Sequence, residues 1–395
     1  MTGWALVAGD FAPLGGMDRA NLALARFLAD RGPVHLVTHR AWDDLAAHPN
    51  VAVHRVFRPL GRQMLGEPLL GWAGRRWARR LARDGFRVVV NGGNCQWPDV
   101  NWVHCVHAAF PNPATDGWAR RAKTRAHHAL SRRNERSVIR AARVVVCNSR
   151  RTAADAVNRL GVEPDRVRVV YLGVDPVRFP PVTPAERAAA RAQLGWDDRP
   201  WVGFVGQLGN RVKGFDTLYA AWQELCRDPR WDANLAVVGT GSELPRWEAR
   251  ADADGLAGRV RFLGYRTDVP EILAGCDAVA HPARYDAYGM AVHEAVCRGV
   301  PVIVSSAAGV SERYPPGLAE LVLPDPEDAG GLADRLWAWR RDLESWPGRV
   351  TGLAAALRAY TWDDMAADFV RAVTGAEPPA TRPYPRIWRP TSSGR

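Results

Sequence analysis

Two acidic residues that could do chemistry, Asp286 and Glu294, stand eight residues apart in the segment 281–306. The segment reads HPARYDAYGMAVHEAVCRGVPVIVSS, and its apolar pattern is interrupted by a proline and by Gly289. This pattern predicts a strand, a loop that carries Asp286, a helix over 290–298 that carries Glu294, and a second strand. In an open parallel sheet such loops and helix starts meet at the ligand-binding edge, so both carboxylates are candidate site residues.

The helical neighbours of Glu294 make its role ambiguous on sequence alone. Met290, Ala291 and Cys297 share its helical neighbourhood, and a carboxylate on such an apolar stripe is costly unless a partner hydrogen-bonds to it. This favours a ligand-binding glutamate. The alternative is an ordinary pair of Glu294 with Arg298, four residues apart on a solvated helix face.

Three glycine-containing loops follow predicted strands and precede predicted helices. Such loops bring backbone amides close to a phosphate at a helix N-terminus, and Lys213 or Arg211 could balance its charge. The alternative for each loop is a tight turn. Neither the Walker spacing nor the full GxGxxG spacing occurs, which argues against a nucleotide hydrolase and a dinucleotide dehydrogenase. The loops are Gly15-Gly16, Gly206-Gln207-Leu208 through Lys213-Gly214, and Gly239-Thr240-Gly241.

The formal charge of +11 comes almost entirely from arginine, because Lys123 and Lys213 are the only lysines in the 395 residues. In such a chain Lys213 marks either a site that needs a compact ammonium group or a lysine retained by chance. The basic surplus indicates polyanionic partners, namely phosphorylated ligands, anionic lipid or nucleic acid.

Histidine and cysteine spacing argues against a metal site. His104 and His107 are three residues apart on a predicted strand, so they point to opposite faces and are not expected to bind one metal ion together. His107 lies where the strand ends and is expected to face the ligand. His104 is expected to lie in the core. The Asp252-Ala253-Asp254 triplet is interpreted as a solvated helix end. Six cysteines without CxxC spacing indicate buried free thiols in a reducing compartment.

Strands and helices alternate twice along the chain, which predicts an α/β fold with two parallel sheets in two domains. The absence of a long apolar run or a basic leader predicts a cytoplasmic protein. The predicted strands are 4–8, 34–38, 51–56, 88–90, 102–106, 144–147, 167–171, 201–205, 234–238, 260–263, 276–280 and 302–304. The predicted domains are residues 1–175, a proline-rich linker at 176–184, residues 185–360, a helix at 361–376 and a disordered tail at 377–395.

From about Trp4 to Val373 the chain resembles the retaining sugar-nucleotide glycosyltransferases of family 4, which have the GT-B fold of two facing Rossmann-like domains. The family pattern EGFGLxxLEAxAxGxPV is matched by DAYGMAVHEAVCRGVPV, residues 286–302. The family's phosphate clamp, GRL followed by KG, is matched by Gly206-Gln207-Leu208 and Lys213-Gly214. Gln207 stands where the family has arginine, and Arg211 is the candidate replacement.

The resemblance also implies roles for single residues. Glu294 would bind the donor ribose, and Asp286 with the loop amides of Ala287 to Met290, including Tyr288 and Gly289, would contact the transferred sugar. Gly15 and Gly16 would lie at the phosphates, with Gly239 in a further phosphate loop, and His107 resembles the active-site histidine near the acceptor. Asp286 replaces the family's glutamate, so the donor sugar is left open. The helix after Thr361 resembles the one that crosses back to the first domain.

The sequence therefore predicts a metal-independent hexosyltransferase without a cofactor, with Lys213, Asp286 and His107 as catalytic residues. It would move a sugar from a UDP- or GDP-sugar to a glycan or lipid-linked acceptor by front-face attack, in cell-surface polysaccharide or glycolipid synthesis. The alternatives are a nucleotide-sugar epimerase of the same fold and a basic nucleic-acid-binding protein, although no nucleic-acid reader motif is present.

Two arginine-rich stretches, 69–83 and 118–143, mix tryptophan, leucine and alanine with basic residues. They predict a basic amphipathic surface that touches anionic lipid on the inner face of the plasma membrane. The alternative is a pair of packed Rossmann helices whose arginines face water.

Overall fold

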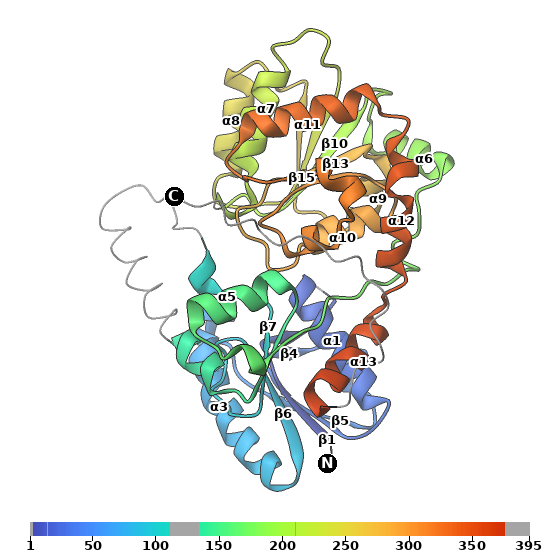
Figure 1. Ribbon diagram of the computed structural model, residues 1–395. Helices are drawn as coiled ribbons and strands as arrows, with labels where there is room; N and C mark the ends of the chain where they lie inside the picture. Colours follow the sequence, from blue (N-terminus) through green and yellow to red (C-terminus); the bar gives the residue numbers. More distant parts are fainter. Residues whose placement is uncertain (1–2, 14, 111–133, 210, 376–395) are drawn as a thin grey trace, which may run out of the picture. The chain divides into compact units, whose positions relative to one another are not determined.

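The computed structural model describes residues 3–13, 15–110, 134–209 and 211–375. The described chain divides into two compact units, each built on a parallel sheet (Figure 1). The first unit contains the chain up to residue 109, residues 134–173 and the C-terminal helix, and the second contains residues 174–359. The predicted disordered tail and most of the basic stretch 118–143 lie outside the described residues.

The sheet of the first unit has seven strands among the described residues, in the order β5-β3-β1-β6-β7-β8-β9. Its central strands are valine-rich and buried on both faces, which is the pattern of a parallel sheet covered by helices. The strands are β1 (Gly3–Val7), β3 (Val34–Thr38), β5 (Val51–Arg55), β6 (Phe86–Asn91), β7 (Val100–Val103), β8 (Val144–Cys147) and β9 (Val167–Val169), with a small separate pair β2 (Asp10–Phe11) and β4 (Arg40–Ala41).

Helices pack on this sheet through apolar stripes. Helix α3 places Leu70, Ala73 and Leu81 in one core with the sheet, and α13 packs on α1 and brings Phe369 to 4.8 Å from Trp102, between ring centroids. The C-terminal helix predicted after Thr361 is thus present and belongs to the first unit. The helices are α1 (Gly16–Ala29), α2 (Asp43–Ala46), α3 (Gln63–Arg83), α5 (Arg150–Leu160) and α13 (Trp362–Thr374), with residues 134–141 also helical.

The second unit has six strands among the described residues, in the order β12-β11-β10-β13-β14-β15. Helix α11 packs on α7, whereas α10 packs on α9 and α12 (Figure 1). The strands are β10 (Trp201–Val205), β11 (Asn234–Val238), β12 (Val260–Gly264), β13 (Ala278–His281), β14 (Val302–Ser305) and β15 (Val322–Leu323). The helices are α6 (Pro184–Leu194), α7 (Phe215–Leu225), α8 (Leu244–Ala253), α9 (Val269–Gly275), α10 (Met290–Cys297), α11 (Ala329–Arg341) and α12 (Trp346–Arg358).

The strand order of each sheet reverses beside its first strand. In the second unit the chain runs outward from β10 through β11 to β12 and then returns to β13 on the other side of β10. In the first unit it runs from β1 through β3 to β5 and returns to β6. Loops diverge at the carboxyl ends of such neighbouring strands, and this is where open α/β sheets bind ligands. The two-sheet α/β prediction is confirmed.

Several predicted boundaries differ from the structure. The strand predicted at 102–106 ends at Val103, because Val106 is fully buried in a core with Ile139 rather than in the sheet. His107 consequently lies in the 3-10 turn η2 (His107–Ala109), after the strand. The strand predicted at 167–171 ends at Val169. The proline-rich segment 176–184 is grouped with the second unit, which begins at residue 174.

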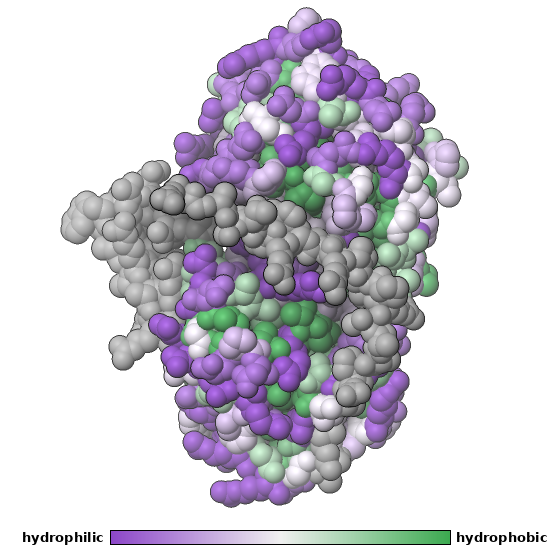
Figure 2. All heavy atoms as spheres, viewed as in Figure 1, coloured by the Kyte–Doolittle hydropathy of each residue, from purple (hydrophilic) through white to green (hydrophobic). Residues whose placement is uncertain are grey.

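All six cysteines are free thiols, and four of them are buried. Burial raises the pKa of Cys147, Cys276 and Cys297 to about 12, so these thiols stay protonated and serve as small apolar core residues. No helix among the described residues combines the length and apolar character needed to cross a membrane. On the face that Figure 2 shows, hydrophilic side chains cover most of both units.

Candidate functional site

The second unit brings Lys213, Asp286 and His281 into direct contact at the carboxyl ends of β10 and β13. Lys213 Nζ donates to Asp286 Oδ2 at 2.6 Å, and His281 Nε2 lies 3.0 Å from the same oxygen. Burial by itself would raise the pKa of the Asp286 carboxyl, but the Lys213 charge and the two hydrogen bonds hold that pKa below its usual range. The site therefore holds an ionised carboxylate against an ammonium group.

Close backbone packing sets this geometry. Gly214 has φ of +73°, and a Cβ there would lie 1.8 Å from the carbonyl oxygen of Pro282. The Arg284 amide donates to the Val212 carbonyl at 2.8 Å. Only glycine fits at position 214, so the Lys213-Gly214 pair is required for the two loops to touch, and their contact places Lys213 against Asp286.

The loops at Gly206 and Gly239 pack on each other in the same way. The Gly206 amide donates to Val238 at 2.9 Å, and Leu208 donates to Thr240 at 3.0 Å. Gly239 has φ of +145°, and its Cβ would lie 1.8 Å from the Gly206 carbonyl oxygen. These contacts account for the glycines through loop packing, the alternative that the sequence left open, and the amides of Gly206 and Leu208 already have carbonyl partners.

The loop from Asp286 to Gly289 is fixed against the segment that follows β14. The Gly309 amide donates to the Asp286 carbonyl at 2.9 Å, and the Val310 amide donates to the Tyr288 carbonyl at 2.6 Å. Gly289, with φ of +102°, begins helix α10. The Tyr288 hydroxyl lies 2.8 Å from His293 Nδ1 in the core, so Tyr288 can contribute to a ligand through its backbone only.

Glu294 lies inside α10 and is 6% exposed. Arg298, four residues later, is 3% exposed, and its guanidinium group hydrogen-bonds to Glu186. Because both residues are buried, the alternative of a Glu294–Arg298 pair on a solvated helix face is wrong. A buried glutamate in the helix that follows the Asp286 loop is consistent with the predicted ribose-binding role.

Arg211 is less available for phosphate than the sequence suggested. Its Nε donates to Asp216 at 2.7 Å, and its Nη2 donates to Glu327 at 3.1 Å. The same two carboxylates hold Arg284, whose side chain is only 6% exposed and which sequence analysis missed. Arg284 donates to both Asp216 oxygens, at 2.6 and 2.9 Å, and to the Arg211 carbonyl at 2.7 Å. Arg284 thus ties the loop before Asp286 to the turn that carries Lys213.

In the first unit, His107 is held by a buried glutamate, Glu135, which sequence analysis also missed. His107 Nδ1 lies 2.9 Å from Glu135 Oε1, and the amides of His107 and Ala108 donate to the same carboxylate. The hydrogen bond to Glu135 raises the pKa of His107, burial opposes it, and the charges of Glu135 and Glu67 add to the rise. One buried carboxylate thus fixes the ring through Nδ1 and also binds the backbone of this turn, while the His107 side chain is 50% exposed.

Gly15 and Gly16 lead into a helix as predicted; α1 begins at Gly16, and Gly15 precedes it with φ of +71°. Asp18 lies in the first turn of this helix, where burial and the neighbouring Asp10 raise its pKa to about 6. An ionised Asp18 would repel a phosphate at this helix end. Phosphate binding at Gly15 and Gly16 would therefore be assisted when Asp18 is protonated.

No group of three or more histidine, cysteine or acidic side chains is arranged to hold a metal ion within the described ranges. The cationic groups beside the Asp286 loop are instead Lys213, Arg211 and Arg284.

Two protein-family models match the chain. Residues 14–178 match the model described as Glycosyltransferase Family 4, and residues 199–342 match the model described as Glycosyl transferases group 1. The first match covers most of the first unit and contains His107. The second contains Lys213, Asp286 and Glu294.

Relatives and solved structures extend these matches over nearly the whole chain. The D-inositol 3-phosphate glycosyltransferase of Nocardia farcinica is 30% identical over 92% of this chain and 85% of its own length. WaaG, a glycosyltransferase involved in lipopolysaccharide biosynthesis, superposes with a TM-score of 0.71 at 22% identity, over 93% of this chain and 99% of WaaG. Anabaena Alr3699/HepE in complex with UDP-glucose gives a TM-score of 0.68 at 20% identity, over 95% of this chain and 100% of that one. These superpositions confirm the predicted GT-B fold.

The role of Glu135 predicts how His107 titrates. Replacing Glu135 with glutamine removes the carboxylate that raises the pKa of His107, so this pKa should fall, while Glu67→Gln should lower it less because Glu67 acts only through its charge. NMR titration of the His107 ring measures both. An unchanged pKa in Glu135→Gln, or a larger fall in Glu67→Gln, would contradict the assignment.

The buried position of Arg284 predicts a loss of stability on substitution. Arg284→Lys cannot keep the bidentate contact with Asp216 and should lower the free energy of unfolding of the second unit by about 3 kcal/mol. Glu327→Gln is the matched control, because Glu327 is 54% exposed and should cost less than about 1 kcal/mol. Urea denaturation gives both values. Equal losses in the two variants would show that Arg284 is not the residue that holds this network.

Proposed function

The chain belongs to glycosyltransferase family 4, and from this premise we propose that it is a retaining enzyme that transfers a hexosyl group from a nucleotide sugar to an acceptor hydroxyl. The observation that carries the proposal is the contact of Lys213 with Asp286 where the loops after β10 and β13 meet. It places one positive and one negative group at the edge of the sheet where a charged ligand binds.

The donor we propose is a UDP-sugar, with a GDP-sugar as the alternative. Support comes from the UDP-glucose complex of HepE, which shares the fold of this chain. Lys213 would bind the diphosphate, and buried Glu294 would accept hydrogen bonds from the ribose hydroxyls. Binding would make Lys213 exchange the single charge of Asp286 for the larger charge of the diphosphate, which would free Asp286 to accept a hydrogen bond from the sugar.

The mechanism we propose is front-face transfer. The bond between the anomeric carbon and the diphosphate oxygen breaks, the acceptor hydroxyl forms a bond to that carbon on the same face, and the departing diphosphate takes the hydroxyl proton. Lys213 stabilises the charge that develops on the leaving group, so the proposed reaction needs no metal ion and no cofactor. In the proposed mechanism Asp286 accepts a hydrogen bond from the sugar and does not act as the nucleophile of a double displacement.

We propose that the first unit contributes His107 to substrate binding. Glu135 fixes its ring through Nδ1 and favours the charged imidazole, so Nε2 would donate a hydrogen bond to a substrate oxygen. The acceptor we propose is a glycan or lipid-linked glycan in cell-surface polysaccharide or glycolipid synthesis, on the cytoplasmic side of the membrane. WaaG, a structural neighbour, acts in lipopolysaccharide biosynthesis.

Donor binding tests the proposal directly. UDP-glucose at about 100 times its dissociation constant should stabilise the protein by about 2.7 kcal/mol, seen as a rise in Tm, and GDP- and ADP-glucose identify the base. Lys213→Ala and Glu294→Ala should weaken donor binding by at least about tenfold, since each removes a hydrogen-bonded or charged contact. Arg227→Gln removes an exposed charge of the same unit and serves as the control. Unimpaired binding in Glu294→Ala would refute its role.

The stereochemistry and the metal requirement form a separate test. With an α-linked donor, NMR of the product should show an α linkage, and turnover should persist in excess EDTA. A β-linked product would exclude front-face transfer. Loss of turnover in EDTA that Mg²⁺ restores would show that Lys213 does not suffice for the leaving group.

A further inference from the structure

Exposed apolar side chains are concentrated on one part of the first unit. Among the described residues, nine large apolar side chains are exposed, and five of them lie between positions 57 and 72. We call these five the α3 apolar surface. They are Phe57 at 75% exposed, Leu60 at 82%, Leu65 at 45%, Leu69 at 38% and Trp72 at 59%.

The most exposed of them also has a strained backbone. Leu60 has φ of 52° and is the only non-glycine residue with a positive φ in the part of the chain that the structure describes. This conformation is unfavourable for a branched side chain, and Leu60 lies in the short turn η1 (Pro59–Gly61) that precedes α3. Because Leu60 is 82% exposed, burial in the protein core does not compensate for this strain.

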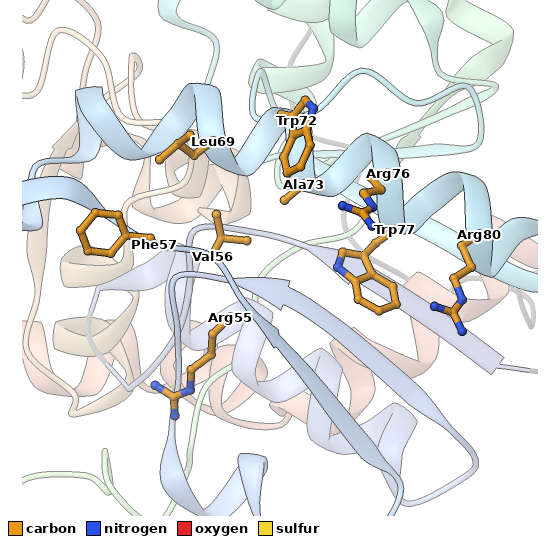
Figure 3. Close-up of a pocket in the computed structure, with 9 residues that line it drawn as sticks. All are labelled: Arg55, Val56, Phe57, Leu69, Trp72, Ala73, Arg76, Trp77 and Arg80. Carbon is orange, nitrogen blue, oxygen red and sulfur yellow. The ribbon is translucent and has the colours of Figure 1, made fainter.

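A groove of about 550 Å³ lies beside this surface, between the chain that follows β5 and one stripe of α3 (Figure 3). Phe57, Leu69 and Trp72 form its apolar part, and three arginines line it. They are Arg55, Arg76 and Arg80.

No ion pair joins Arg55, Arg76 or Arg80 to a carboxylate within the described ranges, whereas Arg284 and Arg298 in the second unit both bind acids. The charge of Arg80 also affects His54. The pKa of His54 is lowered to about 4, mainly by burial, then by the neighbouring His35 and then by Arg80. His54 stacks on Trp77, which lines the groove, with 3.5 Å between ring centroids.

We propose that the groove and the α3 apolar surface dock the protein on an anionic phospholipid membrane. Arg55, Arg76 and Arg80 bind lipid phosphate in the groove, and the apolar side chains enter the interfacial layer of the bilayer. Arg55, at the carboxyl end of β5, lines the groove. The strands of this sheet are parallel, so the chain that leads from β7 to His107 leaves the sheet on the same side. The inference rests on the proposed function in one respect, because a lipid-linked acceptor would be reached from this membrane surface.

Other occupants fit the surface less well. A saccharide would use the tryptophans as stacking platforms but would leave Leu60 and Leu65 without a partner. A second copy of the chain, joined by a twofold axis, would bring unpaired arginines of both copies together. A lipid surface satisfies the leucines and the arginines at once.

Cosedimentation of the full chain with vesicles tests the inference. The protein should sediment with vesicles of equal parts phosphatidylglycerol and phosphatidylcholine at low salt, should be released at high salt, and should bind pure phosphatidylcholine far more weakly. The double variant Arg76→Gln, Arg80→Gln should bind the anionic vesicles roughly 30-fold more weakly. The double variant Phe57→Ser, Leu60→Ser should lose roughly tenfold or more, and this loss should persist when salt is varied.

A matched control lies on the same helix. Arg75→Gln, Arg79→Gln removes the same charge from exposed positions of α3 that do not line the groove, and it should weaken binding by less than about fivefold. All variants should keep the rise in Tm caused by UDP-glucose, which separates a failure of membrane docking from a failure of the proposed function or of folding.

Three results would overturn the inference. The first is no sedimentation of the wild type with anionic vesicles at low salt. The second is an equal loss in the groove and control variants, which would reduce the effect to bulk charge. The third is self-association, measured by light scattering, that Phe57→Ser, Leu60→Ser abolishes without changing vesicle binding; the surface would then be an interface between copies.

Discussion

The ion pair of Lys213 with Asp286 is the interaction on which the second unit's chemistry depends. It exists because Gly214 lets one loop touch the backbone at Pro282 within a distance that no side chain would permit. The Lys213 charge lowers the pKa of Asp286 and keeps its carboxylate ionised, although burial disfavours the charged form. A diphosphate can therefore meet a preformed ammonium group instead of one that must first be ordered, which lowers the cost of binding and of stabilising the leaving group.

In the same unit, acidic side chains balance the charge of a nearly enclosed arginine. Arg284 is nearly enclosed and is held by Asp216 and Glu327, which also bind Arg211. This arrangement explains why Arg211 is a poor substitute for the clamp arginine that Gln207 replaces. The acids that orient Arg211 would have to release it before it could bind a phosphate. Lys213, with one acidic partner that is itself a candidate sugar ligand, carries the proposed phosphate contact more simply.

The fold was predictable because apolar periodicity is local, and β3, β8, β10 and β11 were found at their predicted bounds. The sequence also indicated where three predicted site residues lie. Lys213 and Asp286 are in contact at the carboxyl ends of β10 and β13, and Glu294 lies in the helix that follows Asp286. Glu135 and Arg284 could not be found in this way. Each acts through a tertiary contact, 28 residues from His107 and 68 residues from Asp216, and no local pattern distinguishes it from a solvated side chain. The glycines of the three predicted phosphate loops look alike in sequence, and only the structure shows that Gly206 and Gly239 pack against each other.

The arginines of the two units differ in whether an acidic side chain accompanies them. Where an arginine is buried, as at Arg284 and Arg298, an acid accompanies it, since an unpaired buried charge would cost several kcal/mol. Among the described residues no acid forms an ion pair with Arg55, Arg76 or Arg80, and these arginines lie beside exposed apolar side chains, so desolvation of this surface by a neutral partner would be unfavourable. Only a partner that supplies negative charge and an apolar layer together removes both costs. The formal charge of +11 is therefore better explained by phosphate-bearing partners than by solubility alone.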